Sequence, residues 1–299
     1  MHVKKCIILL ILFSFFLSSC ILNSSIDSSS GSSSSTQNLY IENKGSDTIV
    51  NIALVWAETY QKLYPEIRIS VTGGGSGTGI AALINNTVDI ANASRQIKQK
   101  EIDNAAVNGV TPVEFIIAGD AIAVIVNLEN PINELTIKQI SDIFSGKITN
   151  WSEIGGNDLP IVKLSRETNS GTHVYFLEEV VRQGDKENTT LFSQDTLLLP
   201  SSEGIISEVR DNPNAIGYDG LGYITDEVKV ISVAINAGDD YIIPSIETVN
   251  NKLYPIARNL YMYTNGEPVS HVKEYLEWIL SEEGQLIVAE LGFVPISDN

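Results

Sequence analysis

The stretch Ser165 to Thr172, with the sequence SRETNSGT, combines residue types that bind oxyanions in proteins. It follows the apolar segment Ile161 to Leu164 and precedes apolar residues at helical spacing, which predicts a loop between a strand and a helix. The first turn of such a helix has unpaired backbone N–H groups and the positive end of the helix dipole. Arg166 adds a planar cation that can hold two oxygens, and Ser170 and Thr172 add hydroxyl donors. This loop is therefore a candidate anion site.

A plainer interpretation of the same loop is also open. Ser170 or Thr172 could cap the helix, and Arg166 could pair with a surface acid such as Glu167. This loop alone does not separate the two interpretations, but three earlier stretches of the chain favour an anion site.

Those three stretches occupy the same position between a predicted strand and a predicted helix: Gly45 to Thr48, Gly73 to Gly79 and Asn92 to Arg95. The second is rich in glycine, which lets the backbone approach a ligand closely. Alternating strands and helices predict an α/β sheet with helices on its faces. Ligands of such sheets bind beyond the carboxyl ends of the strands, which is where all four loops fall.

Two enzymatic interpretations of these loops have little support. The glycine-rich loop lacks the Lys-Ser or Lys-Thr pair of a phosphate-binding nucleotide motif, and it lacks the last glycine of a nucleophile elbow. After the N-terminal segment the only histidines are His173, expected to be a partly exposed helix residue, and His271. The sequence shows no metal-spaced cluster, so we predict no metal, no cofactor and no enzyme activity. A phosphate-ester hydrolase stays the less favoured alternative.

The composition limits the partners of the protein. At 299 residues and 43% apolar content, the chain is long enough for two globular domains. Its formal net charge of −18 repels nucleic acid and anionic lipid, so no nucleic-acid partner is expected. The same charge repels an anionic ligand at long range, so an anion site must depend on local geometry.

The N-terminus has the pattern of an export signal. Lys4 and Lys5 precede the apolar run Cys6 to Leu17, and the run is too short for a convincing membrane span. The following Leu-Ser-Ser-Cys resembles a bacterial lipoprotein signal, so residues 1–20 are predicted to end at a lipidated Cys20. An ordinary secretory peptide cut nearby is the alternative. Residues 21–38 are rich in serine and predict a flexible tether. We therefore expect a lipid-anchored protein on the extracytoplasmic face of the cell membrane, with no disulfide in the mature chain.

Two extended crossings divide the remaining sequence. The apolar segments Val113 to Ile117 and Ala121 to Asn127 suggest passage from one lobe to another, and Tyr241 to Ile246 suggests the return. The prediction is a discontinuous lobe I, residues 39–119 plus 246–299, and a continuous lobe II, residues 120–245.

In combination, these features resemble the phosphate-binding proteins of bacterial ABC phosphate importers. The resemblance covers nearly the whole mature chain. It rests on the lipoprotein signal, the serine tether and the stretches GSDT, GGGSGTG, DIANASR, LTIKQISDIFSGKITNW, SRETNSGTH and NPNAIGYDGLGY. It implies a two-lobed periplasmic-binding-protein fold of type II, with phosphate held in the cleft between the lobes. It also implies an ABC permease as partner and a monomer without cofactors.

The resemblance assigns phosphate-binding residues position by position. The first loop supplies Ser46, Asp47 and Thr48, the second Ser76 and Gly77, the third Ser94 and Arg95, and the fourth Arg166, Ser170, Gly171 and Thr172.

One position departs from the family pattern. In the best-studied branch an aspartate follows the serine of the third loop and accepts the phosphate proton, whereas this chain has Arg95 there. Asp47 is our substitute candidate, because a buried carboxylate can accept a proton from phosphate and repels the unprotonated sulfate. Two plainer roles remain open, a helix cap for Asp47 and a salt bridge for Arg95. Carriers of sulfate, molybdate or a phosphonate are the alternatives within the class, and arsenate should be poorly excluded.

Overall fold

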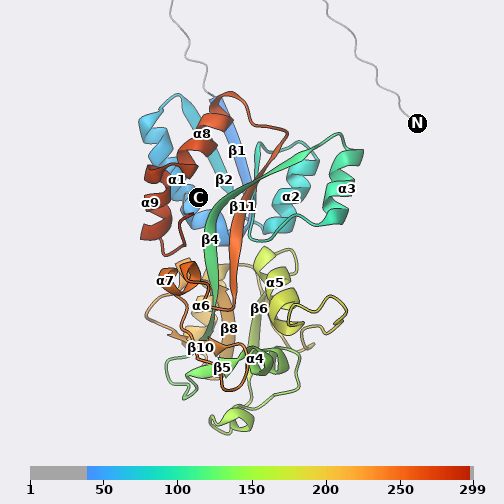
Figure 1. Cartoon of the computed structure of the whole chain (residues 1–299), viewed down its shortest axis with the longest axis vertical. Coiled ribbons are helices and arrows are strands. Elements are labelled where there is room, and N and C mark those ends of the chain that lie inside the picture. Colours follow the sequence, from blue (N-terminus) through green and yellow to red (C-terminus); the bar gives the residue numbers. More distant parts are fainter. Residues whose placement is uncertain (1–38, 297–299) are drawn as a thin grey trace, which may run out of the picture. The chain divides into compact units, whose positions relative to one another are not determined.

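The computed structural model describes residues 39–296 of the chain (Figure 1). The predicted signal peptide, the lipidated Cys20 and the serine-rich tether lie outside the described residues. No helix in the described part of the chain is long and apolar enough to cross a membrane.

The first half of the main sheet gathers three parallel strands and one antiparallel strand beside the long β4. Its order is β2 (Ile67–Thr72), β1 (Leu39–Gly45), β3 (Ile90–Ala93), β11 (Ala257–Asn265) and β4 (Pro112–Val126). Strands β1, β2 and β3 run parallel, and β11 runs antiparallel to both β3 and β4. The carboxyl ends of β1 and β3 therefore lie at the same edge of the sheet, as the loop positions require.

The second half of the sheet continues from the far end of β4. The neighbours follow in the order β8 (Ala215–Gly220), β6 (Val162–Arg166) and β7 (Leu197–Leu199), while the short β9 (Lys229–Val230) also pairs with β4. Strand β8 is antiparallel to β4, and β6 is parallel to both β8 and β7. A separate small sheet pairs β5 with β10, and their bounds are Glu134–Thr136 and Ser232–Ala234.

Helices connect these strands and cover them. They are α1 (Asp47–Leu63), α2 (Ser76–Ile84), α3 (Gln99–Val107), α4 (Ile137–Phe144), α5 (Gly171–Phe176), α6 (Ser202–Asp211), α7 (Ile246–Asn250), α8 (Ser270–Leu280) and α9 (Glu282–Glu290). Shorter helical turns are η1 (Trp151–Ile154), η2 (Leu177–Val181) and η3 (Leu221–Tyr223).

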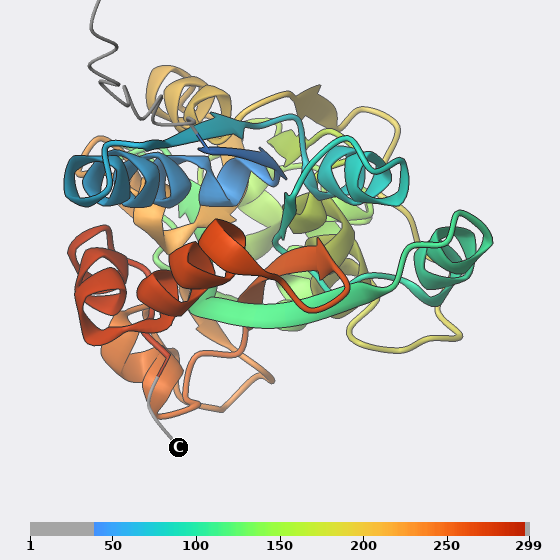
Figure 2. The same ribbon diagram turned by 90° about the horizontal axis from the view of Figure 1, so that it is seen from above.

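Hydrophobic spacing explains how the helices pack. The residues of α1 predicted to share one face include Ile52, Trp56 and Tyr60, and all three are buried. The Trp56 indole donates to Gly284 O at 2.8 Å, which fixes α1 beside α9 (Figures 1 and 2). Strand β3 points Ile90 into this core and Ala91 into the opposite one, where α2 and α3 pack. Helices therefore cover both faces of the first strands, as predicted.

Strand β4 joins the two apolar segments of the expected crossing. It runs unbroken over 15 residues, from Pro112 to Val126, and includes Ala118 to Asp120. Its first part pairs with β11 and its last part with β8, and the change of partner falls at Ala121 and Ile122. The pairing with β11 has a bulge between Leu260 and Tyr261. The boundaries of the two lobes stay a prediction.

Candidate functional site

The first three predicted loops meet through their serine hydroxyls. Ser46 Oγ donates to Ser94 Oγ at 2.9 Å, and the backbone N–H of Ser94 donates to Ser76 Oγ at 3.0 Å. All three side chains are buried. Ser46 lies at the start of α1, Ser76 at the start of α2, and Ser94 directly follows β3. The sheet order, β1 beside β3, places these loops next to each other.

The fourth loop lies against the first two. Thr172 Oγ1 and Thr48 Oγ1 are 2.8 Å apart, and the N–H of Gly77 donates to Asn169 O at 3.0 Å. The Asn169 amide in turn donates to Gly74 O at 2.8 Å. The sequence prediction that these four loops share one place in the fold is consistent with this geometry.

Ser170 has the capping role that the plainer interpretation proposed. Its Oγ accepts from the N–H groups of Thr172 and His173 at the start of α5, at 3.2 and 3.4 Å. A hydroxyl that accepts in this way still has its own hydrogen to donate. Capping and anion binding are therefore compatible at this residue.

Gly171 allows the fourth loop to approach the serines of the others. A Cβ added to Gly171 would overlap the Ser76 hydroxyl and lie 2.5 Å from Ser94 Oγ. The backbone of Gly171 is helical, so alanine would suit its conformation and only the close approach would be lost.

If this is the anion site that the sequence predicts, we expect Gly171→Ala to weaken binding of the anion by about 1 to 3 kcal/mol, the usual effect of overpacking, while the protein stays folded. Titration calorimetry with phosphate measures the first effect and thermal unfolding checks the second. Gly204→Ala is the matched control, because a Cβ at Gly204 in α6 meets only ordinary contacts. Equal phosphate affinity in Gly171→Ala and wild type would contradict the proposed role of this approach.

Arg166 is buried where the fourth loop meets the first. Its Nη2 donates to Asp47 Oδ2 at 2.8 Å and to Pro200 O at 2.9 Å, and its Nη1 donates to Ser202 Oγ at 2.8 Å. Only 1% of its side chain is exposed, and its Nε has no hydrogen-bond partner among the described residues. Arg166 thus pairs with Asp47 from the first loop rather than with the neighbouring Glu167.

Asp219, at the end of β8, holds the other side of Arg166 and was missed in the sequence. Its Oδ2 lies 3.7 Å from Arg166 Nη1, and its Oδ1 accepts from Ser202 Oγ at 2.9 Å. Burial raises the pKa of Asp219, and the Arg166 charge opposes that shift. The sequence signal that could have identified Asp219 is the presence of an acidic residue near the end of an otherwise apolar strand.

Asp47 links two loops. Its Oδ1 accepts from the N–H of Gly74 at 2.9 Å, while its Oδ2 accepts from Arg166. Helix α1 begins at Asp47, and Ser46 occupies the capping position. Asp47 therefore does not cap the helix, and its carboxylate instead joins the second loop to Arg166.

Arg95 of the third loop forms an ion pair with Glu101 of α3, the next helix in the chain. Its Nη1 and Nη2 donate to the two carboxylate oxygens of Glu101 at 2.8 and 2.7 Å. Burial would raise the pKa of Glu101, but hydrogen bonds from Arg95 and from the Lys98 N–H outweigh burial and lower it. This geometry supports the salt-bridge interpretation, and a phosphate contact by Arg95 stays a prediction.

His173 is buried, whereas the sequence suggested partial exposure. Its Nδ1 lies 3.0 Å from Ser165 Oγ, which is also 2.6 Å from the Tyr218 hydroxyl. Burial lowers the pKa of His173, which favours the neutral ring. Ser165 is fully buried beside it, so this serine and histidine form a hydrogen-bonded part of the core.

Comparisons with known proteins identify the family. A model of the PBP superfamily domain matches residues 30–283. The phosphate-binding protein PstS of Pseudomonas aeruginosa is 31% identical over 273 residues, covering 86% of this chain and 83% of that protein. PstS of Bacillus subtilis is 32% identical over 256 residues, covering 85% and 80%. The chain belongs to the PstS family.

Solved structures confirm the fold of this PstS family member. A substrate-binding protein described for phosphate ABC transport in Clostridium perfringens, solved with bound phosphate, is 33% identical. It aligns with a TM-score of 0.76 over 86% of this chain and 100% of that chain. The expected α/β periplasmic-binding-protein fold is therefore confirmed.

A second arginine reaches the same loops and was also missed in the sequence. Arg258 Nη1 donates to Ser94 O at 2.9 Å, and its Nη2 donates to Thr172 Oγ1 at 3.0 Å. Its Nε and Nη2 both donate to Asp120 Oδ2, at 3.1 and 2.8 Å. The sequence analysis assigned binding residues only to the four loops, and Arg258 lies outside them, in β11.

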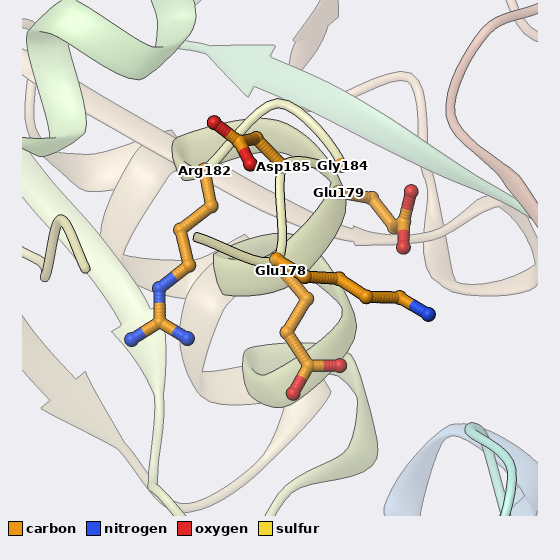
Figure 3. A pocket seen from close by; sticks show the side chains of 6 residues that line it. Glu178, Glu179, Arg182, Gly184 and Asp185 are labelled. Atoms are coloured by element: carbon orange, nitrogen blue, oxygen red, sulfur yellow. The ribbon is translucent and has the colours of Figure 1, made fainter. Parts of the chain in front are cut away.

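The described residues also form a surface pocket apart from these loops (Figure 3). Its volume is about 300 Å³, and residues between Glu178 and Lys186 line it. Both acidic and basic side chains line it, and it contains none of the four loops. No group of three or more histidine, cysteine or acidic side chains in residues 39–296 could hold a metal ion.

Proposed function

We propose that this protein binds inorganic phosphate outside the cytoplasm and delivers it, as a monomer, to the permease of an ABC phosphate importer. The observation that carries this proposal is the buried meeting of four loops that bring hydroxyl donors and Arg166 to one place. The PstS relatives and the phosphate-bound Clostridium perfringens protein support it.

The chemistry of the loops suits phosphate. Its oxygens need many hydrogen-bond donors, and the loops offer the hydroxyls of Ser46, Thr48 and Ser76 and the backbone N–H groups at helix starts. Arg166 adds a delocalised charge that can contact two oxygens. We propose as phosphate-binding residues the set predicted from the sequence: Ser46, Asp47, Thr48, Ser76, Gly77, Ser94, Arg95, Arg166, Ser170, Gly171 and Thr172.

Asp47 gives the site a means of choosing phosphate over sulfate. Near neutral pH phosphate retains a proton and sulfate does not, so a carboxylate gains a hydrogen bond only from phosphate. Asp47 is the carboxylate that joins the first loop to Arg166, and the third loop offers Arg95 instead of an acid. We therefore propose Asp47 as the proton acceptor.

Titration calorimetry of the purified, unlipidated protein with phosphate, sulfate and arsenate tests the function. We expect tight binding of phosphate, comparable binding of arsenate and much weaker binding of sulfate, because a site that pairs with a ligand OH discriminates against ligands without one. Preference for sulfate, molybdate or a phosphonate would identify another oxyanion carrier. Turnover of a phosphate ester would instead indicate a hydrolase.

Membrane attachment is proposed through the lipid on Cys20. In that case Cys20→Ser should move the protein from the membrane fraction to the soluble fraction, because the acyl chains would be the only anchor. Fractionation and mass spectrometry of the N-terminus provide the measurement, with Cys6→Ser, inside the removed signal, as the control. Unchanged fractionation together with a mature N-terminus elsewhere would refute the lipid anchor.

A further inference from the structure

We propose that Arg258 is a positioning residue of the phosphate site, which keeps the hydroxyl of Thr172 turned as a donor toward the ligand. The inference rests on the proposed function. It assigns a role to a buried ion pair, Arg258 with Asp120, that lies outside the four loops.

The ion pair lies where β4 changes its partner strand. Arg258 is the second residue of β11 and stands opposite Asp120 in the antiparallel pairing. Two residues further along, at Ile122, β4 pairs with Gly220 of β8. Only 2% of the Arg258 side chain and none of the Asp120 side chain is exposed. Arg258 is thus held firmly at the point from which it contacts both the third and the fourth loop.

Hydrogen-bond chemistry gives Arg258 its effect on Thr172. A guanidinium only donates, so Thr172 Oγ1 must accept from Arg258 Nη2. The single hydroxyl hydrogen of Thr172 must then point elsewhere, and its other partner at 2.8 Å is Thr48 Oγ1 in the first loop. Either hydroxyl can be the donor of that pair. When Thr48 donates, the Thr172 hydrogen is available to a phosphate oxygen between these loops, because Arg258 prevents it from pointing toward β11.

The charge of Arg258 is already matched. Asp120 accepts two hydrogen bonds from it and a third from the N–H of Leu221 at 3.2 Å. Arg258 therefore differs from Arg166, whose Nε still lacks a partner among residues 39–296. The Arg258–Asp120 pair therefore acts by orienting Thr172 and Ser94, and not by adding a net positive charge near the ligand.

The main test removes both charges together, because a lone buried charge would endanger folding. In the variant Arg258→Met with Asp120→Asn, we expect phosphate affinity to fall about tenfold, the usual effect of one hydrogen bond. A matched control removes another buried cation and its acid, Lys163→Met with Asp195→Asn, and should bind as wild type does. Titration calorimetry and thermal unfolding are measured on each protein.

A second background shows whether Arg258 acts through Thr172. In Thr172→Val, which has no hydroxyl, the same pair of substitutions should change phosphate affinity by less than about twofold. If the losses of phosphate affinity from Thr172→Val and from the Arg258 and Asp120 substitutions simply add, the inference is overturned. Wild-type affinity in the Arg258 and Asp120 variant would also overturn it. If wild type itself binds no phosphate, the proposed function fails instead.

A conservative variant covers the case in which the double variant does not fold. Arg258→Lys retains a charge for Asp120, but one ammonium lacks the fork that spans Asp120, Ser94 and Thr172 together. We expect its melting temperature to stay near that of wild type and its phosphate affinity to fall about tenfold. Wild-type affinity in a folded Arg258→Lys would overturn the inference.

Discussion

Replacing Arg166 with alanine should weaken phosphate binding by about 2 to 5 kcal/mol, or roughly 30- to 5,000-fold. This is the largest effect that we expect from a single side chain. Arg166 is the buried cation of the fourth loop, and its guanidinium faces Asp47, Ser202 and Pro200 within 3 Å. Its loss removes a charge-assisted contact and leaves acidic neighbours without their partner.

Two measurements and two comparison variants make the Arg166 prediction specific. Phosphate affinity by titration calorimetry gives the effect, and thermal unfolding shows whether the loss of pairing with Asp219 also destabilises the fold. The phosphate affinity of Arg166→Lys should lie between those of Arg166→Ala and wild type, because lysine retains the charge without the two-pronged geometry. Arg68→Ala, at an exposed arginine of β2, is the control. Near-wild-type affinity in Arg166→Ala would remove Arg166 from the proposed site.

Replacing Asp47 with asparagine should lower the ratio of phosphate to sulfate affinity by at least about tenfold. Asparagine has nearly the same shape and can still accept from the N–H of Gly74. It carries no charge, however, and its amide nitrogen cannot accept the phosphate proton. Phosphate binding should therefore fall, while sulfate binding should hold or rise because the repulsion is gone.

The affinity ratio is the quantity to measure, at matched pH and salt in wild type and variant. Glu167→Gln serves as the control, because it removes an exposed acid next to Arg166 without touching Asp47. A ratio unchanged by Asp47→Asn would assign the carboxylate to loop structure alone, through Gly74 and Arg166.

Local patterns predicted the elements that position the site. Helical spacing in α1, alternating strands and helices, and four polar loops after strands were visible in the sequence. The sheet order then brings Ser46, Ser76 and Ser94 within hydrogen-bond distance. Such predictions succeed because cap, loop and hydrophobic period are properties of neighbouring residues.

Long-range pairing was beyond the same patterns. Arg258 and Asp120 are 138 residues apart, and each interrupts an apolar strand with no local sign of its partner. Asp219 is similar, because its direct contact with Arg166 and its link through Ser202 of α6 both join residues far apart in the sequence. The continuity of β4 is a related case, because its pairing with β11 keeps Ala118 to Asp120 extended between the two apolar segments.

The burial of Arg166 has a consequence for the rate of capture. An anion approaching from solution meets a surface of formal net charge −18, while this cation, 1% exposed, is hidden from it. From the net charge we expect no electrostatic attraction to speed the encounter, and we expect added salt to shield an approaching phosphate from repulsion. Once the ligand is inside, its contacts are shielded from the same salt. We therefore expect phosphate association to become faster as ionic strength rises, and the residence time to depend on the buried donors.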